Sequence, residues 1–204
     1  MRGIFGVALL CALLTSGCVR THTEVRPTPV TERCDATQAQ LSAEADQRAS
    51  PFNIEKHLAT NFPDRKVSWL MKDSAYQSFV VATNAKNFGR CNDTGCYLFA
   101  APTAVIQKAV HASMKDGKHD PAELGTALGL PAKNFEGTLR MMTLDLDATG
   151  VCVRLPVESD PGVWKCTSPE DKDCFKFGGY TSGGVPEVMV INAPVAAAQI
   201  EEVP

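Results

Sequence analysis

The sequence lacks a hydrophobic segment long enough to cross a membrane as a helix. Its apolar stretch near the N-terminus covers only residues 3–14, whereas a membrane-spanning helix needs about 20 apolar residues. No other stretch of the chain is long and apolar enough to do so. We therefore expect no permanent transmembrane helix.

An excess of positive charge is also missing. The 20 lysines and arginines are outnumbered by 23 aspartates and glutamates, which gives a formal net charge of -3. Proteins that bind nucleic acid or anionic lipid headgroups usually carry a basic surface. The sequence therefore predicts neither kind of partner.

The common catalytic motifs are absent as well. The chain has no GxSxG, no HExxH and no phosphate-binding glycine loop, so the usual hydrolase and nucleotidase reactions have no support. The spacing of the four histidines completes neither a recognisable metal set nor a Cys-His nucleophile pair; they are His22, His57, His111 and His119. We predict no bound metal and no resident cofactor.

The N-terminus has the order of a secretory signal peptide. Arg2 precedes the apolar residues 3–14, and three small residues then precede Cys18. This segment resembles a bacterial lipobox, in which the cysteine is acylated before the signal is cleaved, with Thr15 where the motif usually has leucine. The resemblance implies that residues 1–17 are a signal peptide and that Cys18 carries the lipid anchor.

The residue after Cys18 bears on the destination of such a lipoprotein. Val19 stands where an aspartate would retain the protein at the inner membrane. The resemblance therefore implies an outer-membrane lipoprotein whose domain faces the periplasm or the cell surface. The alternative is an ordinary signal peptide, with Cys18 as a free thiol or a disulfide partner.

Cysteine parity favours the lipoprotein interpretation. Of the eight cysteines, Cys11 leaves with the signal and Cys18 takes the lipid, so an even number remains for pairing in an oxidising compartment. A zinc site is disfavoured by the spacing and by the compartment. Six cysteines allow 15 possible pairings. One of these combines the local pairs Cys91 with Cys96 and Cys166 with Cys174 with the long-range pair Cys34 with Cys152.

Composition predicts one folded domain behind a tether. The content of 44% hydrophobic and 21% charged residues is typical of a globular chain. We predict that residues 18–50 form the lipidated N-terminus and a tether. Within this segment, residues 35–49 form either a weakly packed helix or a continuation of the tether. Residues 51–204 read as the globular domain.

Local patterns predict an α+β domain with a mixed or antiparallel sheet and two or three helices. Pro102 opens one helix, and Asp120, Pro121 and Glu123 supply an N-cap, a first-turn proline and a reciprocal capping partner for another. Apolar and β-branched runs predict strands. The expected strands are residues 76–83, 96–101, 139–146, 151–157 and 187–191.

The most unusual segment is residues 175–192, FKFGGYTSGGVPEVMVIN. Its two glycine pairs allow a tight turn or a close approach to a ligand, with Tyr180, Thr181 and Ser182 exposed between them. Glu187 is the one carboxylate at the mouth of the strand that follows. The alternative is a plain hairpin loop with a solvated glutamate.

Three short motifs carry a further resemblance. YLFAAP at residues 97–102, ALGLP at 127–131 with Asn134, and GGYTSGGVPE resemble the C-terminal modules of bacterial polymorphic toxins, some of which are similar to ADP-ribosyltransferases. The resemblance implies that NAD is a substrate. It assigns Glu187 to stabilise the oxocarbenium-like sugar, Tyr97 or Tyr180 to stack on nicotinamide, and Ser182 to position the ribose.

A second hypothesis stays open beside this one. The first predicted strand, residues 76–83, lacks the arginine or histidine that the transferases carry on an early strand; Arg90 or Arg140 could replace it, and nothing in the sequence selects one of them. The chain would then be a non-catalytic envelope lipoprotein that binds a protein partner, such as an immunity or structural protein. The enzyme hypothesis predicts that Glu187, the glycine-rich loop and Tyr97 meet in one cleft.

Overall fold

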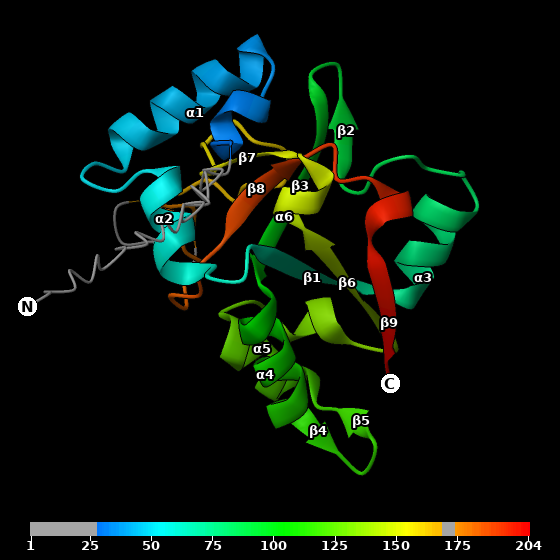
Figure 1. The fold of residues 1–204 in the computed structure, drawn as a ribbon. Helices are drawn as coiled ribbons and strands as arrows, with labels where there is room; N and C mark the ends of the chain where they lie inside the picture. The colour runs from blue at the N-terminus through cyan, green and yellow to red at the C-terminus, as the bar shows by residue number, and fades with distance from the viewer. Residues whose placement is uncertain (1–27, 169–173) are drawn as a thin grey trace, which may run out of the picture.

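The computed structural model describes residues 28–168 and 174–204 (Figure 1). The predicted signal peptide, Cys18 with its lipid, and the tether up to residue 27 lie outside these residues. The described chain combines helices with one large antiparallel sheet, which confirms the predicted α+β class.

The main sheet has seven strands, and its continuous path runs β7-β8-β3-β1-β6-β9, with β2 paired to the first part of β3. Every pairing is antiparallel. The expected strands at 96–101, 139–146, 151–157 and 187–191 are present with shifted ends. The bounds are β1 Lys66–Lys72, β2 Arg90–Asn92, β3 Gly95–Pro102, β6 Leu139–Asp145, β7 Cys152–Arg154, β8 Val188–Ile191 and β9 Gln199–Val203.

The sheet buries apolar side chains on both faces. Successive residues of a strand point to opposite faces, and along β6 Met142 and Leu144 enter one hydrophobic cluster while Leu139 and Met141 enter another. The helices around the sheet cover these clusters. Their bounds are η1 Val30–Arg33, α1 Ala36–Arg48, α2 Ile54–Asn61, α3 Asp73–Tyr76, α4 Thr103–Ser113, α5 Pro121–Leu128, η3 Ala132–Phe135, α6 Leu146–Thr149 and η4 Val195–Ala197.

Figure 1 shows α4 and α5 side by side at one end of the molecule and α1 and α2 at the other. Ile106 of α4 and Leu124 of α5 pack in the cluster of Leu139 and Met141. Between α4 and α5 the chain forms a short hairpin of β4 Met114–Lys115 and β5 Lys118–His119. The pair α4–α5 therefore forms a layer over one half of the sheet.

Most of the capping features predicted for helix α5 are present. The Asp120 carboxylate accepts hydrogen bonds from the backbone N–H groups of Ala122 and Glu123, at 2.9 and 3.1 Å, and Gly129 ends the helix with φ 64°. The reciprocal half of the capping box is absent because the Asp120 N–H donates to Ser113 O. Glu123 instead lies 2.7 Å from Lys115 Nζ.

The strand predicted at residues 76–83 is wrong. This segment continues α3 into the π-helix η2 Gln77–Val81. The place between β3 and β6 is occupied by β1, which pairs with both, so the residues after it lie outside the sheet and satisfy their backbone groups as a helix. Phe79 and Val81 are accordingly exposed, at 70% and 52%.

Among the described residues, buried packing extends back to Val30, before the expected domain boundary at Pro51. Val30 and Ala45 are fully buried in the main core, so η1 and the helix expected within residues 35–49 belong to the folded body. All three disulfides have the pairing considered from the sequence. Cys34–Cys152 joins this N-terminal segment to β7 across 118 positions.

A buried polar network fixes α1 to the sheet. Arg154 of β7 is fully buried and pairs with Asp160 through two hydrogen bonds, while its Nε donates to Gln38 Oε1 at 3.0 Å. Gln38 Nε2 in turn donates to the Tyr97 hydroxyl at 2.8 Å, and that hydroxyl also bonds to Thr94. Because each charged or polar group has a partner, burial does not leave an uncompensated charge.

Candidate functional site

The glycine-rich segment folds into a hairpin directly before β8. The Glu187 N–H donates to Gly179 O at 2.8 Å, and the Thr181 N–H donates to Val185 O at 2.8 Å. The Gly184 N–H closes the tip by donating to Thr181 O at 2.9 Å. The hairpin thus delivers Glu187 to the start of β8.

The tip of this hairpin packs on the C-terminal end of α5. Thr181 Oγ1 donates to Leu128 O and Ser182 Oγ donates to Gly129 O, each at 3.2 Å. A Cβ atom built on Gly183 would lie only 2.4 Å from the Gly129 Cα atom. Glycine is therefore required here by close backbone contact, and the hairpin does not protrude as an isolated loop.

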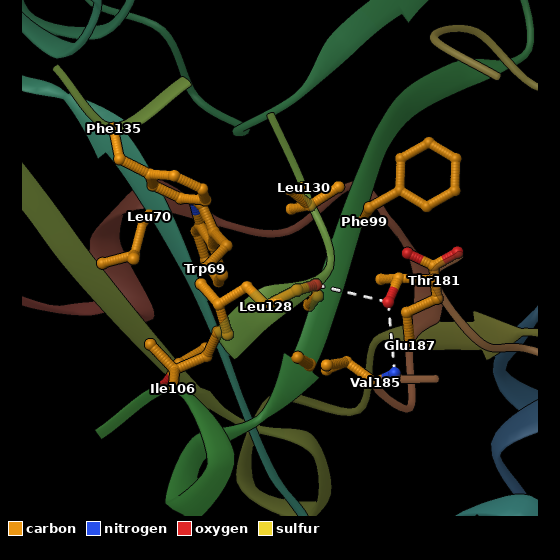
Figure 2. Close-up of a pocket in the computed structure, with 13 residues that line it drawn as sticks. Trp69, Leu70, Phe99, Ile106, Leu128, Leu130, Phe135, Thr181, Val185 and Glu187 are labelled. Carbon is orange, nitrogen blue, oxygen red and sulfur yellow. Dashed lines mark hydrogen bonds between the residues drawn. The ribbon is translucent and has the colours of Figure 1, made fainter. Parts of the chain in front are cut away.

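A cavity of about 110 Å³ lies among the hairpin, β3, β1 and the α4–α5 layer. We call it the Glu187 pocket, because among the described residues Glu187 is the only charged one in its lining. Figure 2 shows Glu187, Thr181 and Phe99 grouped on one side of it. The other main lining side chains are Trp69, Leu70, Ile106, Leu128, Leu130, Phe135 and Val185.

Glu187 is half-buried as a residue in this apolar surrounding. Within residues 28–168 and 174–204 it has neither a hydrogen bond nor an ion pair to its oxygens. Burial of the charged form raises the pKa of Glu187 to about 7, because removing a carboxylate from water costs free energy that no cation offsets here. The carboxyl can therefore gain or lose a proton near neutral pH.

His57 of α2 supports the base of the hairpin. Its Nε2 atom lies 3.2 Å from Glu187 O, and its Nδ1 atom lies 3.2 Å from the Asn61 side-chain amide. Burial lowers the pKa of His57. In its neutral form the ring donates from Nε2 to this carbonyl and accepts at Nδ1 from the amide. His57 is thus a positioning residue, and no local pattern in the sequence marks it.

The other predicted site residues lie around this pocket or away from it. Tyr180 packs edge-on against His57, with ring centroids 5.1 Å apart, and accepts a hydrogen bond from Asn61. Together with Ser182 it lines a second hollow that shares Thr181 with the Glu187 pocket. Neither Tyr180 nor Ser182 lines the Glu187 pocket itself.

Tyr97 is not brought to Glu187. It is 4% exposed, and its hydroxyl is bonded to Gln38 and Thr94 beneath α1. Its neighbour Phe99, two positions along β3, occupies the pocket lining in its place. The structure therefore brings the glycine-rich hairpin and Glu187 together without Tyr97.

The arginines considered as substitutes for an early-strand residue do not line the pocket either. Arg140 pairs with Asp73 at 2.7 Å and with Glu202 at 3.2 Å. Arg90 lies on β2 and is exposed. The observed first strand, β1, contains no arginine or histidine of its own.

No family model, no curated protein and no solved structure matches this chain. Among the described residues, no helix combines the length and apolar character that crossing a bilayer requires. The same part of the chain contains no group of three or more histidine, cysteine or acidic side chains placed to hold a metal ion.

Proposed function

We propose that the chain is an envelope lipoprotein whose folded domain binds a protein partner by receiving one side chain in the Glu187 pocket. The proposed lipid on Cys18 anchors it to the outer membrane, and the partner is a protein of the same envelope. The three disulfides support a compartment outside the cytoplasm, because such bonds persist where the environment is oxidising.

The observation that carries this proposal is the chemistry of the pocket. Among the described residues, the lining side chains are apolar apart from the Glu187 carboxyl, the hydroxyls of Ser68 and Thr181 and the indole N–H of Trp69, and the volume of about 110 Å³ is below the roughly 300–1,000 Å³ of sites that enclose drug-sized ligands. One side chain fits such a space. Leu130, at 42% exposed, offers an apolar rim that a partner can cover.

Catalysis has less support from the same geometry. A nucleophile or general base works with a second group that orients or activates it, and the part of the lining that the structure describes contains no histidine, lysine or arginine. Glu187 is also the only titratable side chain in that described lining. A binding pocket needs no second group.

Photo-crosslinking tests the proposal in cells that make the protein. A benzophenone amino acid at Leu130 should give a discrete adduct with one envelope protein, and Val185→Phe should abolish the adduct by filling the pocket. A benzophenone amino acid at exposed Glu201 on β9 is the matched control position. If no adduct forms at Leu130, or if Val185→Phe leaves it unchanged, partner binding at this pocket is refuted.

A second candidate function is NAD cleavage or ADP-ribosyl transfer. It is favoured by one observation, that the glycine-rich hairpin and Glu187 line the same pocket. A carboxylate there would stabilise positive charge on the ribose as nicotinamide leaves. Nicotinamide release by the oxidised mature protein, lost in Glu187→Gln, would favour this function over simple binding, and no release would remove it.

A further inference from the structure

We propose that the side chain received by the Glu187 pocket is basic, a lysine or an arginine on an exposed segment of the partner. This inference rests on the binding function proposed above. It assigns the apolar walls to the aliphatic part of that side chain and the Glu187 carboxyl to its cationic end.

The argument begins with what the pocket would require of other side chains. An apolar residue would cover the carboxyl and leave it without a partner, which costs free energy. An acidic residue would add repulsion between like charges. Lysine and arginine combine a long apolar stem with a terminal cation, so their stem can contact Phe99 and Leu130 while the cation reaches Glu187.

Other carboxylates in the described chain have the cationic partner that Glu187 lacks. Asp73 pairs with Arg140, Asp147 with Arg33 and Arg65, and Asp160 with Arg154. These aspartates find an arginine within the same fold. Glu187, in a more apolar site, has no such cation among the described residues, and a partner can supply it.

Among the described residues, no neighbouring charged group competes for this role. The strands β1 and β3, helices α4 and α5 and the segment that ends in η3 contribute only uncharged side chains to the lining. On α2, His57 contacts the backbone carbonyl of Glu187, and burial lowers the pKa of its ring. Tyr180 of the hairpin packs on His57 outside the lining.

The charge state of Glu187 makes the interaction depend on pH. With a pKa of about 7, about one tenth of the carboxyl is ionised at pH 6 and about nine tenths at pH 8. Only the ionised form attracts a cation, and apparent affinity scales with the fraction of protein that is competent to bind. A basic side chain should therefore bind about tenfold more tightly at pH 8 than at pH 6.

The test uses the mature lipoprotein in detergent micelles and short peptides Ac-Gly-Gly-X-Gly-Gly-NH2, with X as Lys, Arg, Leu, Gln or Glu. Binding is followed by NMR at the methyl groups of Leu130 and Val185. The Lys or Arg peptide should give saturable shifts at pH 8, about tenfold weaker binding at pH 6, and no pH dependence in Glu187→Gln. Glu201→Gln is the matched control and should bind as the native protein does.

Several results would overturn the inference, and they separate it from the proposed function. Equal or tighter binding of the Leu or Gln peptide, with the crosslink at Leu130 intact, would refute the basic side chain and keep partner binding. No binding of any peptide together with no crosslink would refute both. Tighter binding of 1-methylnicotinamide, whose pyridinium ring is cationic, than of the Lys and Arg peptides would instead favour the NAD function.

Discussion

Replacing Glu187 by glutamine should make the folded protein more stable at alkaline pH and leave its stability nearly unchanged in acid. The folded state raises the pKa of this carboxyl from 4.5 to about 7. Below pH 4.5 the carboxyl is protonated in both the folded and the unfolded chain, and glutamine has nearly the same shape. Between pH 4.5 and 7 the unfolded chain loses its proton first, so the native protein loses stability as the pH rises.

The magnitude follows from that difference in pKa. At about 1.4 kcal/mol for each pKa unit, full ionisation costs the folded state about 3 kcal/mol, and partial access of water to the carboxyl lowers this to about 1–3 kcal/mol. Glutamine removes the cost because it never ionises. We therefore expect Glu187→Gln to exceed the native protein in stability by that amount above pH 7.

Urea unfolding with the disulfides intact measures the effect, read from tryptophan fluorescence at pH 4.5 and pH 8.5. The quantity of interest is the difference between variant and native protein at each pH, so other titrating groups cancel. Glu201→Gln, at an exposed carboxyl, should differ from the native protein by less than about 0.5 kcal/mol at both pH values. Equal differences for Glu187→Gln at the two pH values would refute the desolvated carboxyl on which the pocket argument depends.

Three further variants test the rest of the structure. The double change Cys34→Ser and Cys152→Ser should lower the free energy of unfolding by up to about 5 kcal/mol, because it opens a loop of 118 positions; an unchanged urea midpoint in non-reducing buffer would contradict this. Gln38→Ala should cost about 2–4 kcal/mol by leaving the buried arginine of β7 with an unpaired N–H, whereas Gln40→Ala, on the exposed side of α1, should cost under about 0.5 kcal/mol in the same titration. Gly183→Ala should separate the hairpin from α5 and abolish the Leu130 crosslink; a crosslink of native yield would show that this contact does not shape the pocket.

The elements predicted correctly are those with strong local signals. Asp120, Pro121 and Gly129 are read within one stretch of chain, and the structure uses each as its type requires. The two disulfides between near neighbours are predicted by the short spacing of their cysteines around turn residues. Once these two pairs are assigned, Cys34 and Cys152 are the two cysteines left to pair. These signals depend little on distant parts of the chain.

The missed elements depend on tertiary context. The sequence patterns predict no strand at β1, which is bounded by lysines, although β1 lies at the centre of the sheet between β3 and β6. Strand β9, QIEEV, is polar because it lies at the sheet edge, where its residues are largely exposed. Residues 76–83 have strand-like composition but no partner strand, so composition alone predicted the wrong structure there.

The candidate site was predictable only in part, for the same reason. The glycine pairs and Glu187 form a recognisable local segment. The wall of the pocket comes from Phe99 on β3 and Leu130 after α5, and the support comes from His57, 130 positions before the carbonyl that it contacts. No spacing in the sequence reveals contacts of that range.

The Cys34–Cys152 bond has a mechanical consequence for a protein held by its N-terminus. Under the proposed anchor at Cys18, a force between membrane and partner loads η1 first and then reaches Cys34, where a covalent bond transmits it to β7. Helix α1 and its buried hydrogen bonds lie beyond that junction and carry little of the load. Force applied at the membrane anchor therefore does not unfold α1, as long as this disulfide stays oxidised.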